Sequence, residues 1–224
     1  MRRLIFPIIL GLGGAAILIS LGIWQVQRLG WKESMLAEIE ARIVDAPVAL
    51  PADPDPESDR YLPVTVEGHY LPGDILVLTG MPRIGPGYQV IAPFETTDGR
   101  KILVDRGFVA EAQKSDERPP LAGRLVGNLH WPEESDSYTP DPDLAASLWF
   151  ARDVPAMADA LGTEPILLVL RETDETDPVV IPRPVTTQGI PNDHLGYAIT
   201  WFGLAAVWLG MTAFLIRRIT RAED

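Results

Sequence analysis

The most constraining feature of this chain is a segment near its C-terminus, 195–216, whose 22 residues include no charged side chain. At about 1.5 Å of rise per residue, a helix of that length extends roughly 33 Å, and the hydrocarbon core of a membrane is roughly 30 Å thick. A second stretch near the N-terminus, 4–24, is uncharged over 21 residues. The sequence therefore predicts two membrane-spanning helices, over 4–27 and 195–216.

The N-terminal stretch differs from a cleavable secretory signal. Its apolar run is longer than the roughly 7–15 residues of a signal, and no Ala-x-Ala cleavage site follows it. Leu36, Ile39 and Ile43 continue the helical spacing beyond the apolar run. We therefore expect the first helix to extend past the membrane.

Positive charges beside the two predicted helices indicate how the chain crosses the membrane. The outer flanks carry Arg2, Arg3, Arg217, Arg218 and Arg221. Because arginine and lysine favour the cytoplasmic side, these residues predict that both termini, including the tail 217–224, are cytoplasmic. Arg28 and Lys32 follow the first helix on the opposite side and weaken that bias. The predicted periplasmic domain is then 28–193.

The segment between the helices has the pattern of a β-rich domain. Runs of β-branched and aromatic residues predict strands over 62–70, 75–79, 88–94, 101–109, 124–129 and 166–170. Asp98 and Gly99 indicate a hairpin turn, and Asp153 and Gly162 are typical caps for a short helix over 154–161. The predicted fold class is an α+β membrane protein, in which two transmembrane helices flank a β-rich periplasmic domain with short helices.

The composition excludes several classes of site. The whole chain has a net charge of −12, and because the outer flanks and the tail contribute +3, the segment between the helices carries −15. Such an acidic segment argues against nucleic acid as a partner, whereas membrane lipid surrounds the helices. With no cysteine, the chain has no disulfide, thiolate metal site or cysteine nucleophile. Its three histidines are far apart, and no metal-binding, nucleotide-binding or serine-hydrolase motif is present. We interpret two of them, His69 and His130, as structural.

The second predicted helix has two different faces. At about 100° per residue, one face carries His194, Tyr197, Ala198, Trp201, Ala205, Trp208 and Thr212. The opposite face carries Gly196, Gly203 and Gly210. The first helix has a small-residue seam of Gly11, Ala15, Leu18 and Gly22. Because glycine lets helices approach closely, we expect the glycine face to pack against this seam.

The face that carries His194 then remains for another neighbour. It suits a flat planar ligand or a polar partner helix. Alternatively, Tyr197 and Trp201 belong to an interfacial aromatic belt and His194 only caps the helix. The residue types and their spacing leave these alternatives open.

Four segments, in order along the chain, carry a family resemblance. They are GIWQVQRLGWK (22–32), GYQVIAPFETTDGRKILVDRGFVA (87–110), WFARDVPAMADALG (149–162) and NDHLGYAITWFGLA (192–205). Together they resemble the surfeit-locus, or Shy-type, assembly factors of cytochrome c oxidase over almost the whole chain. Phe108 and Ala110 stand where that pattern has Trp and Pro.

The resemblance implies a protein that assembles haem–copper oxidase without enzymatic turnover and that binds haem a near its second helix. It implies that His194 contacts haem, and an axial metal ligand is one form of that contact. Tyr197 and Trp201 would then pack on the macrocycle. On the first helix, Trp24 and Arg28 share a face at the same depth, so Arg28 suits a haem propionate. The implied partners are cytochrome c oxidase subunit I and haem a synthase.

Two other function classes fit the sequence. One is a scaffold that stabilises subunit I without binding haem, because aromatic helix faces also bind helices. The other is a membrane enzyme acting on haem or lipid, which needs a paired acid and base, and the sequence offers only Asp193 and His194. The short N-terminal flank before residue 4 leads us to expect a bacterial inner membrane protein rather than a mitochondrial one.

Overall fold

The computed structural model describes residues 2–118, 122–173, 180–188 and 190–221. It divides the chain into two compact units. The helical unit combines Met1–Glu38 with Thr187–Asp224, and the sheet unit is Ile39–Thr186. Two apolar terminal helices and a mixed β-sheet are therefore present as the sequence predicts.

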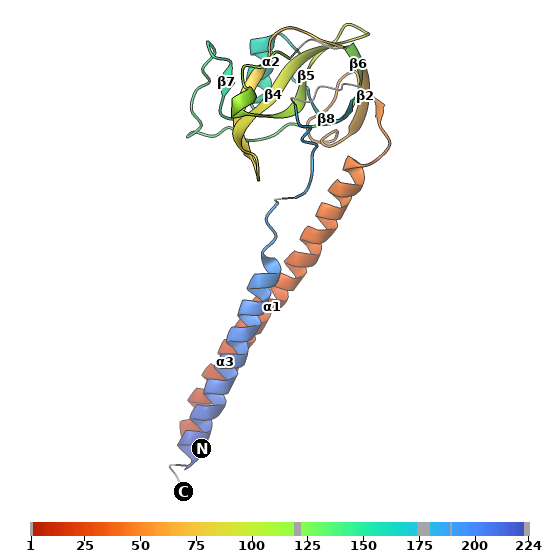
Figure 1. The fold of residues 1–224 in the computed structure, drawn as a ribbon. Coiled ribbons are helices and arrows are strands. Elements are labelled where there is room, and N and C mark those ends of the chain that lie inside the picture. The colour runs from red at the N-terminus through yellow and green to blue at the C-terminus, as the bar shows by residue number, and fades with distance from the viewer. Residues whose placement is uncertain (1, 119–121, 174–179, 189, 222–224) are drawn as a thin grey trace. The chain divides into compact units, whose positions relative to one another are not determined.

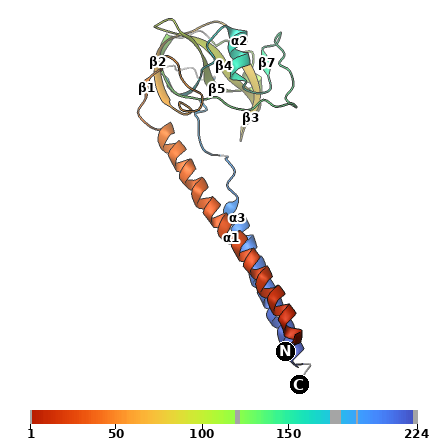
Figure 2. The ribbon, with the colours of Figure 1, turned by 180° about the vertical axis from the view of Figure 1, so that it is seen from behind.

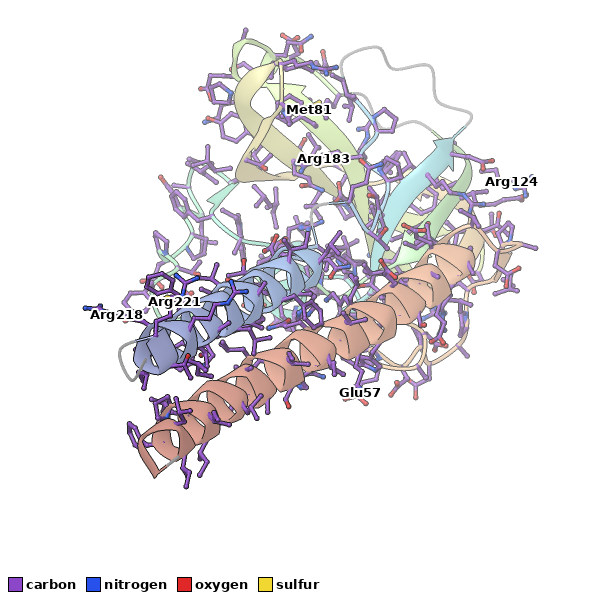
Figure 3. The ribbon with its side chains drawn as sticks, turned by 90° about the horizontal axis from the view of Figure 1, so that it is seen from below. Glu57, Met81, Arg124, Arg183, Arg218 and Arg221 are labelled. Atoms are coloured by element: carbon purple, nitrogen blue, oxygen red, sulfur yellow. The ribbon has the colours of Figure 1, made fainter. Side chains whose placement is uncertain are left out.

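The helical unit contains two helices, α1 (Arg2–Ile43) and α3 (His194–Arg221). The part of α1 that belongs to this unit ends at Glu38. The two helices run antiparallel and side by side (Figures 1 and 2). Both are long and apolar enough to cross a membrane. As predicted, α1 continues well beyond its uncharged stretch. Pro7 lies inside this helix, near its start. The last turns of α3 carry Arg218 and Arg221 (Figure 3).

The predicted packing of glycine on glycine is wrong. Open space surrounds Gly196, Gly203 and Gly210, where an added Cβ meets nothing within 4 Å. Instead, Ala198 and Ala205 are buried, so the face of α3 that carries the histidine is the one turned toward α1.

The small-residue seam of α1 does face α3, but its partners there are larger side chains and not glycines. An added Cβ on Gly11 would lie 2.2 Å from Thr212, and one on Gly22 would lie 2.7 Å from the Phe202 ring. Trp208 donates from Nε1 to Gly11 O at 3.0 Å. This bond stabilises the packing, because an indole N–H without a partner is costly in an apolar medium. Large side chains of α3 therefore occupy the space that the glycines of α1 leave open.

The sheet unit is built on eight strands. They are β1 (Val48–Ala49), β2 (Pro63–Tyr70), β3 (Ile75–Met81), β4 (Gly85–Thr96), β5 (Lys101–Ala110), β6 (Ala122–Leu129), β7 (Leu148–Trp149) and β8 (Leu167–Thr173). Their order is β1-β2-β6-β8-β5-β4-β3-β7. The unit also contains a 3₁₀ turn, η1 (Glu111–Gln113), and α2 (Val154–Leu161). All six predicted strands and the predicted helix are confirmed, whereas the two-residue strands β1 and β7 were not foreseen.

An additional pairing closes part of the sheet on itself. The end of β2 pairs antiparallel with β4 as well as with β6, so β2, β6, β8, β5 and β4 form a ring (Figure 1). Gly68 makes this possible, because a Cβ there would lie 2.0 Å from the carbonyl oxygen of Glu95. Ring closure removes exposed strand edges, which is the usual solution for a small β structure.

Two buried clusters explain why the central strands are continuously apolar. Phe94, Ile102 and Leu168 belong to one cluster, which is formed by β2, β4, β5, β6 and β8. The alternate residues Leu103 and Leu167 point to the other cluster, which α2 covers (Figure 2). A strand buried on both faces needs apolar side chains at every position, so its sequence does not alternate.

The last turn of α1 belongs to the sheet unit and is anchored there. Ile43 is buried, and its carbonyl oxygen accepts hydrogen bonds from Asn128 Nδ2 and Arg171 Nη1, both at 2.9 Å. These side chains satisfy a carbonyl that has no partner within the helix. They thereby define where α1 ends.

Candidate functional site

A partly buried hydrogen bond joins the two long helices at the first residue of α3. Nδ1 of His194 lies 2.8 Å from Oε1 of Gln25 on α1. Gln25 is only 8% exposed and directly follows the uncharged stretch of its helix. Because an unpaired polar group is costly away from water, the imidazole and the amide satisfy each other. His194 is therefore held in place by the neighbouring helix.

A cationic and aromatic group lies on α1 next to this hydrogen bond. The guanidinium of Arg28 lies over the ring of Trp24 at 5.8 Å and over that of Trp31 at 5.1 Å. Both indole rings are about half exposed. Cation–π contacts of this kind hold the guanidinium against the helix while its N–H groups stay available to an anionic ligand.

The helix contacts show which residues lie level with His194. An added Cβ on Gly14 would lie 2.5 Å from Trp208, so these two positions face each other. Arg28 comes fourteen residues after Gly14, and His194 fourteen residues before Trp208. Side chains return to nearly the same helix face every seven residues, and the helices are antiparallel. Arg28 therefore lies level with His194, on the same flank of the helix pair.

The same helical spacing gives the positions of the remaining predicted site residues. Trp201 lies one heptad from both His194 and Trp208, is partly buried, and belongs to the same flank. Tyr197 is exposed, one turn further along α3 from His194. Helical spacing thus places His194, Tyr197 and Trp201 on the side of α3 that matches the side of Trp24 and Arg28 on α1.

The donor set of this site matches haem better than a free metal ion. In the described part of the chain, no group of three or more His, Asp or Glu side chains is placed to hold a metal. A single imidazole cannot form a four- to six-coordinate ion site. Haem iron already has four porphyrin ligands and needs only an axial one, so His194 with a nearby guanidinium and aromatic rings fits that group.

Gln25 is the site residue that sequence reasoning missed. It lies in the motif WQVQRLGWK, between two tryptophans, and its signal was an amide at a position that faces the partner helix. The helical phase of Gly11, Ala15 and Gly22 places residue 25 on the same seam. Because the sequence pattern predicts a glycine partner for this seam, it predicts no contact for the amide.

Comparison with known proteins gives the family. The model of the SURF1 family matches residues 12–206, which is most of the chain. This chain belongs to the SURF1 family. The match includes the sheet unit and both halves of the site at His194, because Gln25 and His194 lie inside it.

Individual relatives agree with the SURF1 family model. Surfeit locus protein 1 of Rattus norvegicus is 34% identical over 211 residues, covering 84% of this chain and 68% of the rat protein. A SURF1-like protein of Monosiga brevicollis is 33% identical, covering 89% of this chain and 83% of that protein. A SURF1-like protein of Rickettsia bellii is 31% identical, with coverage of 85% and 82%. The similarity therefore extends to animals and to bacteria.

The sheet unit of this SURF1 family member contains a second group of polar residues, around Asp105 on β5. Asp105 is 1% exposed and accepts hydrogen bonds from Gln89 Nε2, from Arg152 Nη1 at 3.3 Å and from Gly107 N at 3.2 Å. Arg152 also donates to Glu134. Burial raises the pKa of Asp105 to about 6, against the opposing charge of Arg152. An enclosed, fully partnered carboxylate suits a structural role, since a general base must reach its substrate.

The other two histidines of this family member differ from His194. His130 stacks on Tyr61 with ring centroids 5.4 Å apart, and burial, with the nearby charge of Arg152, lowers its pKa to about 4. His130 is therefore a neutral packing residue. His69 is exposed on β2 and far along the chain from either long helix.

Proposed function

We propose that this SURF1 family member is an assembly factor for haem–copper cytochrome c oxidase that holds haem a beside His194. The observation that carries the proposal is the arrangement of His194, fixed by Gln25, with Arg28 level on the same flank. Membership of the SURF1 family supports the oxidase-assembly part. The protein acts by binding and handing over its cargo, and we propose no catalytic turnover.

Each site residue has a separate task in this proposal. His194 would supply a nitrogen ligand to the haem iron, and Tyr197, Trp201 and Trp24 would provide flat apolar surface for the macrocycle. Arg28 pairs with a propionate through charge-assisted hydrogen bonds, which suit its planar guanidinium. The bound group supplies the redox-active iron that the oxidase later uses.

The location follows from the two apolar helices and the charges around them. We propose that α1 and α3 cross the bacterial inner membrane, with the Arg217, Arg218 and Arg221 end in the cytoplasm and the sheet unit in the periplasm. The site at His194 is then at the periplasmic boundary of the membrane. The receiving partner is subunit I of the oxidase, and the supplying partner is haem a synthase.

The decisive experiment compares the haem content of detergent-purified protein from cells that make haem a. We expect wild-type protein to retain haem, His194→Ala to lose it by tenfold or more, and Arg28→Ala to retain it more weakly. His69→Ala is the matched control, because it removes an exposed imidazole from the sheet unit, and it should bind like the wild type. Absorption spectra and membrane-fraction immunoblots measure haem content and insertion.

The same experiment separates the proposal from a scaffold that binds no haem. If purified wild-type protein carries no haem while its deletion still reduces assembled oxidase, the scaffold is the correct function. If His194→Ala keeps the full haem spectrum, His194 is not a ligand.

A further inference from the structure

We propose that Gln25 is a positioning residue that holds His194 in one tautomer, with the proton on Nδ1 and the lone pair on Nε2. For the ligand that uses this lone pair, the inference rests on the proposed haem function. For the tautomer itself, it rests only on the contact between α1 and α3.

The hydrogen bond has one possible direction when the carbonyl oxygen of Gln25 is the partner. Oε1 of an amide only accepts, and it lies 2.8 Å from Nδ1 of His194. Nδ1 must therefore carry the proton and donate. A neutral imidazole has one protonated nitrogen, so Nε2 is left as the acceptor. Nε2 makes no hydrogen bond to any residue that the structure describes.

The surroundings of Gln25 keep this direction fixed. Its side chain is buried against α3, and Gly22, Ala15 and Gly11 continue the contact toward the start of α1. Water has little access to the amide, so breaking the bond leaves a buried polar group without a partner. A histidine in water favours the opposite tautomer, with the proton on Nε2. The protein therefore selects the form that is less favoured in solution.

This choice matters for any ligand that approaches Nε2. A ring nitrogen binds iron through its lone pair, and the second nitrogen usually donates to an oxygen acceptor that orients the ring and raises its basicity. In this protein, Oε1 of Gln25 is the oxygen acceptor for the second ring nitrogen of His194. Loss of such a partner typically lowers metal affinity by about 10–100-fold.

The first test needs no haem. Full-length protein with ¹⁵N-labelled histidine, in detergent at about pH 8, gives ring signals from only three histidines. A His194→Asn sample assigns the signals. We expect the wild type to have the proton of His194 on Nδ1, and Gln25→Met, which is similar in size but has no acceptor, to shift it to Nε2. Gln25→Glu keeps an oxygen acceptor and should restore the wild-type pattern.

The matched control is Trp208→Phe. It removes another hydrogen bond between the helices, from Trp208 Nε1 to Gly11 O, at a distance of two heptads from His194. It should weaken helix packing without changing the tautomer of His194. A wild-type protein with the proton on Nε2, or a tautomer unchanged in Gln25→Met, overturns the inference.

The second test adds haem to the same purified proteins. We expect Gln25→Met to bind it about 10–100-fold more weakly than the wild type and to lower the iron–histidine stretching frequency of the ferrous complex. Gln25→Glu and Trp208→Phe should keep a strong iron–histidine bond. If the wild type binds no haem, the proposed function fails while the tautomer measurement still decides the role of Gln25. If haem binds equally and with the same frequency in Gln25→Met, the positioning role is wrong.

Discussion

Two side chains of the sheet unit, the buried Asp105 and the half-buried His130, have pKa values shifted in opposite directions. Burial raises that of Asp105 to about 6 and lowers that of His130 to about 4. The folded protein therefore favours a protonated Asp105 and a neutral His130. The contribution of Asp105 to stability is complete below about pH 4 and is lost as the pH rises through 6. The contribution of His130 is complete above about pH 6.5 and is lost as the pH falls through 4.

Because the two contributions to stability change with pH in opposite directions, removing Asp105 and removing His130 should have opposite effects on the pH dependence of stability. Between pH 4 and 6, the melting temperature of Asp105→Asn should rise with pH, because the His130 contribution is then no longer opposed by that of Asp105. His130→Phe keeps the stacking on Tyr61 and should melt at a lower temperature as the pH rises. A shift of about two pKa units corresponds to about 3 kcal/mol at most.

The measurement is thermal unfolding of the full-length protein in detergent, followed by the β-sheet circular dichroism signal. The groups that face Asp105 and His130, namely Arg152, Arg60 and Glu134, remain in both variants. Wild-type protein, in which the slopes oppose each other, should change least. Parallel pH curves for the two variants would contradict the assigned protonation states.

At the scale of elements, α1 and α3 pack by placing large side chains of one helix into glycine hollows of the other. Gly11 faces Thr212, Gly14 faces Trp208 and Gly22 faces Phe202. Gly203 has the same residue type in an equally apolar helix but faces open space. The two kinds of glycine differ only in their surroundings, which makes a direct comparison possible.

Gly11→Leu should separate the helices, whereas Gly203→Leu should leave them paired. Leucine at 11 collides with Thr212 and displaces Trp208, and leucine at 203 points into open space. The chain has no cysteine, so a pair introduced at the buried positions Ala15 and Ala205 can report helix contact by disulfide formation. We expect cross-linking to fall several-fold with Gly11→Leu. Equal cross-linking in both leucine variants would show that the contact face is different.

At the scale of the whole molecule, the proposed topology predicts which residues are accessible from each side of the membrane. The proposed topology places the sheet unit in the periplasm and the end of α3 in the cytoplasm. Tyr138 in the sheet unit is 90% exposed, and Thr220 is exposed near the end of α3. In a cysteine-free chain, either position accepts a single reporter cysteine.

Intact cells carrying Tyr138→Cys should react with a membrane-impermeant maleimide, and those carrying Thr220→Cys should react only after permeabilisation. The physical reason is the cost of moving the arginines beside Thr220 across the membrane. Labelling is read by the gel shift of the affinity-purified protein. Reaction of Thr220→Cys in intact cells, with Tyr138→Cys protected, would reverse the topology.

Local pattern was sufficient to predict the elements of this protein. Strand propensity and the cap residues Asp153 and Gly162 located the six longer strands and α2, because these signals are local in the chain. Ring closure through β2 and β4 was not predictable, since it depends on Gly68 meeting a strand that lies more than twenty residues away. The strand β7 pairs over only two residues and is too short for a sequence pattern.

At the candidate site, the sequence by itself determined that His194 begins an apolar helix and that aromatic residues follow at helical spacing. Only the tertiary structure decided which face of α3 meets α1 and that Gln25 is the partner of His194. The physical reason is that a small-residue seam accepts either another glycine face or large side chains. The buried amide and the indole N–H favour the face that satisfies both, and that balance exists only when the two helices are together.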